Sequence, residues 1–185
     1  MVNFLWDNLF VKDKGQLALK EALQNCYLFE NLLPQEIHLL LKIVHTRNFR
    51  PGEYIFKQGE IGVGMYILLS GSVDIIVTTA KESLDNANNK VVSILKPQSF
   101  FGEHSLVEEN GRRSASAMAR EEVQVLGFFK PDLQEIIERS PTTGVKILYR
   151  LGEILGKRLK ETSVKVSELK RQIELITPPT SSHEQ

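Results

Sequence analysis

The spacing of apolar residues changes character along the chain. Residues 13–30 and the segment that follows Pro34 carry apolar side chains at near-helical spacing, which predicts two helices and a helical extension over residues 1–30. From Phe49 to Phe129 the apolar residues instead form short β-branched and aromatic runs between turn residues. The strands predicted there are Tyr54–Phe56, Met65–Leu69, Val73–Thr79, Val91–Leu95, Ser114–Ala119 and Val123–Phe129.

Many short strands at this spacing predict a barrel or a jelly roll over residues 31–140. The expected fold class is α+β, mainly β, with a double-stranded β-helix (jelly roll) flanked by N-terminal helices and a long C-terminal helix. The polar stretch Lys81–Lys90 predicts an extended hairpin loop. Pro131 is placed to begin a short helix, which Pro141 is expected to end.

Residues 141–176 form the most periodic segment. Its mostly apolar stripe recurs at alternating spacings of four and three: Leu148, Gly152, Leu155, Leu159, Thr162, Val166, Leu169, Ile173 and Ile176. This heptad pattern predicts a long helix that pairs with a second copy in a parallel dimer. The alternative is a helix that lies on its own barrel, although about 30 residues at about 1.5 Å each reach well past a small barrel. Residues 177–185 lack this periodicity and are expected to be disordered.

Composition excludes several classes of function. The 185 residues include 23 Lys plus Arg and 23 Asp plus Glu, so the formal charge is zero. Direct binding of nucleic acid, which needs clustered positive charge, is not expected. The single Cys26 cannot form an intrachain disulfide and suits a reducing compartment, so we expect a cytoplasmic protein. The longest uncharged run, Ile61–Val73, is too short to span a membrane, and the N-terminus lacks the pattern of a secretion signal.

Two neighbouring motifs carry the candidate chemistry. Residues 51–73, PGEYIFKQGEIGVGMYILLSGSV, have glycines between short β runs, which alone indicate hairpin turns. Residues 100–119, FFGEHSLVEENGRRSASAMA, place a glycine and an acid before a helix-compatible stretch and two arginines. Helix-terminal N–H groups and an arginine can bind phosphate while a carboxylate accepts a sugar hydroxyl, which fits a ribose phosphate. The alternative places Arg112 and Arg113 in a solvated turn beside acidic residues.

Together the two motifs resemble the cyclic nucleotide-binding domain family. Residues 100–119 are similar without a gap to the phosphate-binding cassette of its bacterial catabolite activator members, and the resemblance spans roughly residues 28–170. It implies that Glu103 binds the ribose 2′-hydroxyl and that Arg113 pairs with the cyclic phosphate. It also implies a cradle completed by Ser114 and by backbone groups of three further residues: Gly102, His104 and Ser105. His104 stands where these relatives usually have a small or aliphatic residue.

The stretch Lys157–Val166 resembles the long dimer helix of the same activators. That resemblance implies that Thr162 and Ser163 meet the adenine from both subunits, although a threonine on a heptad seam is also simply tolerated. The implied ligand is therefore cAMP. cGMP stays open, because a hydroxyl like that of Ser114 also follows the arginine in relatives that bind guanine. The chain is expected to lack the activators' DNA-binding domain.

These features predict a cyclic nucleotide-binding sensor that couples ligand binding to the position of its dimer helix. No enzyme activity is expected, since the histidines show no metal-ligand spacing and no nucleophile elbow is present. The alternative is a jelly-roll scaffold that binds no ligand and serves for dimerisation and protein interaction. The sequence does not identify a downstream protein partner.

Overall fold

The structure, a computed structural model, describes residues 15–79 and 88–176. A helix over residues 15–25 comes first. The helical elements after it are η1 (Tyr27–Phe29), α2 (Pro34–Leu40), η2 (Glu103–Leu106), α3 (Lys130–Arg139) and α4 (Pro141–Ile176). The strands are β1 (His45–Phe49), β2 (Tyr54–Phe56), β3 (Gly64–Ser70), β4 (Val73–Thr79), β5 (Asn88–Leu95), β6 (Phe100–Phe101), β7 (Ser116–Ala119) and β8 (Val123–Phe129).

The strands form two four-stranded antiparallel sheets, with the orders β1-β8-β3-β6 and β2-β7-β4-β5. Because side chains alternate across a strand, β3 and β8 bury residues on both faces of the first sheet. Leu68 and Val125 face the second sheet, where they pack with Val73. Met65 and Phe128 face the helices. The predicted jelly-roll class is confirmed.

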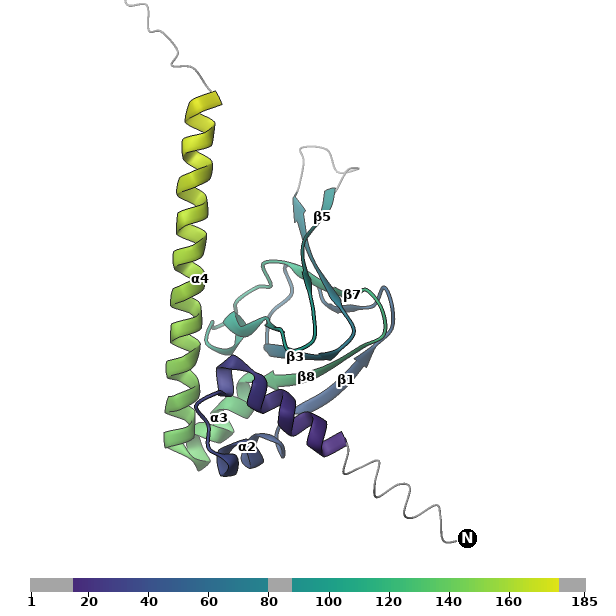
Figure 1. Ribbon diagram of the computed structural model, residues 1–185, viewed down its shortest axis with the longest axis vertical. Helices are drawn as coiled ribbons and strands as arrows, with labels where there is room; N and C mark the ends of the chain where they lie inside the picture. Colours follow the sequence, from purple (N-terminus) through teal and green to yellow (C-terminus); the bar gives the residue numbers. More distant parts are fainter. Residues whose placement is uncertain (1–14, 80–87, 177–185) are drawn as a thin grey trace, which may run out of the picture.

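The helices cover the outer face of the first sheet. Figure 1 shows the helix over residues 15–25, α2 and α3 on the side of the sheet where β8 and β1 lie, with α4 rising beside the jelly roll. Leu23, Ile37, Ile136 and Ile147 pack together in the core cluster that also contains Phe128. The N-terminal helix therefore shares its core with α3 and α4.

Proline and acidic side chains fix where α2 and α3 begin. Each has Pro in its first turn, and each has an acid that accepts a hydrogen bond from the backbone N–H just before the helix. Asp132 accepts from the Phe129 amide at 2.7 Å. Ser140, with φ −146° and ψ 78°, then leaves helical geometry before Pro141 starts α4.

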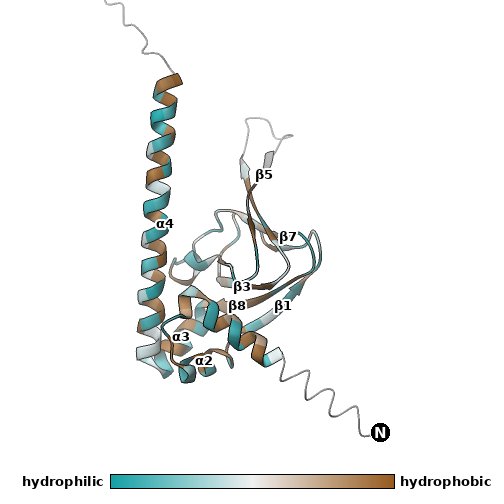
Figure 2. Ribbon diagram, in the orientation of Figure 1, coloured by the Kyte–Doolittle hydropathy of each residue, from teal (hydrophilic) through white to brown (hydrophobic). Residues whose placement is uncertain are grey.

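The helix α4 is buried at its base and exposed at its far end. Ile147, Leu151 and Ile154 are buried, whereas every residue from 161 to 176 is exposed. Figure 2 shows apolar and polar bands alternating along this exposed part. The heptad pattern correctly predicted a long helix, but the buried residues at its base are not those of the predicted stripe, of which only Leu155 is partly buried against the core.

Two strands were not predicted, and three predicted segments lie partly or wholly outside the described residues, among them the helical extension over residues 1–30, of which residues 1–14 are not described. β1 has the polar sequence HTRNF and is mostly exposed, and it forms by pairing with β8. β6 has only two residues and pairs with β3. Asn88–Lys90, expected in the hairpin loop, belong to β5. Residues 81–87 of that loop and the tail at 177–185 lie outside the description.

Candidate functional site

A cavity of about 420 Å³ opens between the jelly roll and α4. It is lined from β2, the β6–η2 segment, the loop before β7, and α4. Six of the predicted site residues line it: Gly102, Glu103, His104, Ser105, Arg113 and Ser114. The structure therefore brings the whole predicted cassette to one cavity.

Gly102 sets the course of the backbone at the start of η2. Its φ of +78° is left-handed, a region that glycine adopts without strain. A Cβ atom on Gly102 would lie 2.5 Å from Nη1 of Arg113. Glycine thus provides both the turn into η2 and the space that the guanidinium fills.

Arg113 is held by hydrogen bonds on the inner wall of the cavity. Its side chain donates through Nη1 to Gly102 O at 3.1 Å and Ser105 Oγ at 2.8 Å, and through Nη2 to Gly64 O at 2.7 Å. The guanidinium also stacks 4.0 Å from the ring centre of Phe56. Burial lowers the pKa of Arg113, and nearby acidic groups partly offset this. An arginine nevertheless stays charged at neutral pH.

The Arg113 Nε atom is buried and has no hydrogen-bond partner among the described residues. The alternative that placed both arginines in a solvated turn is wrong for Arg113, which is 6% exposed. Arg112 is the exposed one, and it donates to Gly59 O at 2.7 Å. The Nε–H group of the buried arginine is therefore left without an acceptor among the described residues.

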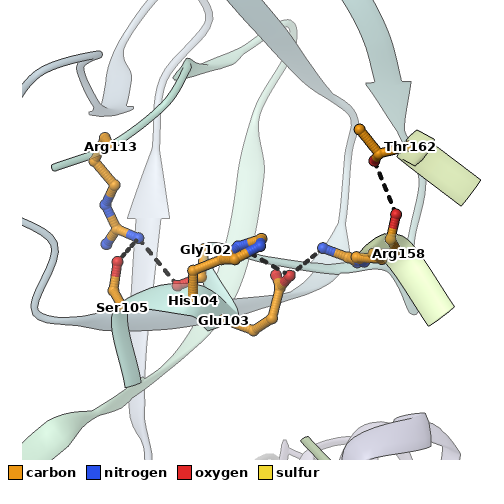
Figure 3. A network of polar contacts seen from close by, with 7 residues as sticks. All are labelled: Gly102, Glu103, His104, Ser105, Arg113, Arg158 and Thr162. Atoms are coloured by element: carbon orange, nitrogen blue, oxygen red, sulfur yellow. Dashed lines mark hydrogen bonds and ion pairs between the residues drawn. The ribbon is translucent and has the colours of Figure 1, made fainter. Parts of the chain in front are cut away.

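Glu103 is fully buried, and its two oxygens are in different environments. Oε1 contacts Nη1 of Arg158 from α4 and lies 3.2 Å from Nδ1 of His104. Oε2 is buried and has no partner within the described part of the chain. Figure 3 shows Arg158 and His104 approaching the same carboxylate from two sides. A buried carboxylate needs such compensation, and here it leaves one acceptor atom open.

Thr162 and Ser163 do not line the cavity of the single chain. Both are exposed on α4, and the Thr162 hydroxyl donates to Arg158 O one turn back, at 2.8 Å. In Figure 3 Thr162 lies beyond Arg158 along the helix. The contacts with adenine assigned to these two residues stay a prediction.

Sequence reasoning missed Arg158. Its guanidinium lies 5.3 Å from the ring centre of Phe100, so it closes one side of the cavity. The available signal was a basic residue inside the very stretch that resembled the dimer helix, Lys157–Val166. Charge pattern alone gave no reason to choose Arg158 over its lysine neighbours.

Within residues 15–79 and 88–176, no group of three His, Cys, Asp or Glu side chains could hold a metal ion. Over the same ranges, no helix is both long and apolar enough to cross a membrane. Neither finding says anything about residues outside these ranges.

Comparisons with known proteins agree with the fold. The chain is 33% identical over 142 residues to the cyclic AMP receptor protein of Thermus thermophilus, covering 77% of this chain and 61% of that protein. It is 28% identical over 151 residues to a CRP-like cAMP-activated global transcriptional regulator of Mycobacterium tuberculosis, covering 82% and 63%. The chain thus spans less than two thirds of the length of these relatives.

A solved structure and a family model complete the comparison. The crystal structure of the Thermus thermophilus catabolite activator protein matches with a TM-score of 0.67 at 33% identity, over 78% of this chain and 63% of that one. The model of the cyclic nucleotide-binding domain matches residues 46–140, just over half of the 185 residues. That range contains both sheets and the cassette. We conclude that the chain belongs to the cyclic nucleotide-binding domain family.

Proposed function

We propose that the chain is a cyclic nucleotide sensor whose cavity binds the ligand through Glu103 and Arg113. The observation that carries this proposal is that two residues lining one cavity each keep a buried atom without a partner among the described residues, the acceptor Oε2 of Glu103 and the donor Nε of Arg113. Leaving such a group unpaired costs about 1–3 kcal/mol. A ribose hydroxyl and a phosphate oxygen would satisfy them, and a cavity of about 420 Å³ is of the size that small ligands occupy.

Among cyclic nucleotides, cAMP is the ligand we propose. The bacterial relatives named above are a cyclic AMP receptor and a cAMP-activated regulator. A cAMP-bound PfPKA-R structure also matches, with a TM-score of 0.58 at 26% identity over 66% of this chain. A cGMP-dependent protein kinase of Plasmodium berghei is similar too, at 26% identity, so cGMP is the ligand to compare.

The contact between Arg158 and Glu103 supports coupling between the ligand and α4. A ligand that binds Oε2 of Glu103 adds a second contact to the carboxylate through which α4 reaches η2. The ligand can shift the equilibrium between two positions of α4 by no more free energy than the difference in its binding free energy to the two. We propose that the exposed outer half of α4 pairs with a second copy of the chain. This pairing would bring Thr162 and Ser163 near the adenine ring of the ligand.

We propose binding without chemical turnover, since neither contact requires the nucleotide to be consumed. Cys26 is a free and buried thiol, which suits the reducing cytoplasm, where we propose that the protein acts. The partner that receives the signal is a separate protein whose identity the site does not specify.

Titration calorimetry with cAMP and cGMP tests the ligand assignment. We expect Arg113→Gln to weaken cAMP binding by about 2–5 kcal/mol, because the phosphate loses its buried cation. Arg139→Gln is the matched control, since Arg139 pairs with Glu135 on α3 and lies outside the cavity lining. In the parent, ligand at about 100 times its Kd should raise the unfolding free energy by about 2.7 kcal/mol.

Hydrogen exchange along α4, with and without cAMP, gives a second readout of the same samples. Coupling predicts a ligand-dependent change near Arg158. If the parent binds neither nucleotide, the sensor assignment is wrong and the scaffold alternative gains support.

A further inference from the structure

The imidazole of His104 lies against the buried carboxylate of Glu103. Nδ1 of His104 is 3.2 Å from Oε1 of Glu103, and the histidine side chain is 59% exposed while the glutamate side chain is 0% exposed. Successive side chains on a 3₁₀-helix point about 120° apart, so this contact is not a necessary result of sequence adjacency. The imidazole is turned back over the carboxylate.

Arg158 and His104 both approach the same oxygen of Glu103. Nδ1 of His104 and Nη1 of Arg158 lie against Oε1, whereas Oε2 is buried without a partner among the described residues (Figure 3). Two nitrogens against one oxygen favour one rotation of the carboxylate about its last side-chain bond. The oxygen left free is then held in one place rather than exchanged with the other.

Arg158 and His104 belong to different structural elements. Arg158 comes from α4, whose residues 161–176 are all exposed. His104 follows Glu103 directly in η2, so it stays beside the carboxylate wherever α4 goes. Nδ1 can carry a proton in the neutral imidazole as well as in the imidazolium, so either form can offer a donor to the carboxylate.

We propose that His104 is a positioning residue that holds Glu103 with Oε2 free for a ribose 2′-hydroxyl. The cavity would then keep its preference for cyclic ribonucleotides over 2′-deoxy analogues even when Arg158 has moved away with α4. The inference rests on the proposed function, because it assigns the ribose hydroxyl to Glu103.

The test measures the ratio of the Kd for 2′-deoxy-cAMP to the Kd for cAMP, by calorimetry, in variants of the whole chain. The parent ratio should be on the order of tenfold or more, as expected for a hydrogen bond to a charged acceptor. Arg158→Gln should keep most of it. Adding His104→Leu should then lower the ratio by about threefold or more, because the glutamate regains rotational freedom.

Rescue separates positioning from a merely structural effect. His104→Asn places an amide N–H where Nδ1 stands, so in the Arg158→Gln background it should restore the ratio. His104→Ala, a second variant without a donor, should behave like His104→Leu. Thermal unfolding of each variant checks the fold, which the 59% exposure of His104 makes tolerant of substitution.

An equal loss of affinity for both nucleotides would leave the ratio unchanged and overturn the inference. An asparagine variant that behaves like leucine overturns it as well. If the parent shows the expected ratio but either of these two results is found, the proposed function is retained and only the role of His104 is rejected. A parent that binds neither nucleotide removes both.

Discussion

Gly62 leaves no room for a methyl group beside the buried arginine. A Cβ atom there would lie 2.0 Å from Oγ of Ser105 and 3.3 Å from Nε of Arg113. The Ser105 hydroxyl is the group that accepts from Arg113 at 2.8 Å. One glycine in the loop before β3 therefore keeps the guanidinium and its serine partner in place.

Gly62→Ala should lower the unfolding free energy by about 1–3 kcal/mol, because Ser105 must move from a packed site. It should also weaken cAMP binding, since the Arg113 guanidinium loses a hydrogen bond that orients it. Gly156→Ala is the matched control: its Cβ would meet nothing within 4 Å on α4, so alanine should stabilise the helix by about 0.5–1 kcal/mol. Chemical denaturation measures both. Equal effects of the two substitutions would contradict the close packing at Gly62.

The resemblance of residues 100–119 to the family's phosphate-binding cassette predicted Gly102, Glu103 and Arg113 as site residues, whereas the residue pattern alone left a solvated turn open. It could not predict that Arg158 contacts Glu103, since 55 residues separate the two. That contact depends on where α4 crosses the jelly roll, which packing of the whole core decides.

At the scale of elements, the outer half of α4 packs against no other element among residues 15–79 and 88–176. Its apolar stripe is exposed, with Leu159 at 69%, Leu169 at 50% and Ile173 at 62%. Large apolar side chains lined up on one helix face are typical of a helix that packs against another helix. The stripe thus supports pairing of two chains through α4.

Leu169→Gln should shift the protein from dimer to monomer in light scattering, because it places a polar group on the seam. The fold of the single chain should be unaffected, since Leu169 is already half exposed there. Arg171→Gln, on the opposite face of the helix, is the control and should leave the dimer intact. A parent that is monomeric at every concentration tested would refute pairing.

Sequence periodicity predicted the existence of α4 but not its surroundings, since a stripe does not specify its partner. It failed for β1, where HTRNF shows no alternation of apolar and polar residues. That strand exists because β8 offers it backbone hydrogen bonds. β8 itself was predicted with its exact bounds, because it buries side chains on both faces.

At the scale of the whole molecule, Glu36 ties the N-terminal helices to the base of α4. It accepts hydrogen bonds from Lys146 Nζ at 2.8 and 2.9 Å and from the Thr143 hydroxyl at 2.9 Å. Burial alone would raise the pKa of Glu36, but hydrogen bonds from Lys146, the Leu33 amide and Thr143 outweigh it, and the pKa lies below its ordinary value. The contacts of Glu36 with Thr143 and Lys146 join parts of the chain more than 100 residues apart.

Because the pKa of Glu36 is lower in the folded protein than its unfolded value near 4.5, Glu36 stabilises the fold at pH values above 4.5. This stabilisation is lost as the pH falls through the folded-state pKa. Glu36→Gln should therefore lower the unfolding free energy at pH 7 by about 1–2 kcal/mol. The gap between variant and parent should shrink on acidification below pH 4.5. Glu135→Gln removes an exposed pair and should change stability by about 0.5 kcal/mol or less. A constant gap from pH 7 to pH 3 would argue against this linkage.

The anchoring of α4 at one end makes it a lever arm with its fulcrum near Ile154, the last buried residue. Arg158 stands about 6 Å along the helix from that point, and Ile176 about 33 Å, at 1.5 Å per residue. If the rod turns rigidly, a displacement of about 1 Å at the cassette becomes roughly 5 Å at the tip. An event as small as a carboxylate gaining one hydrogen bond would thus be magnified into a movement that another protein can detect.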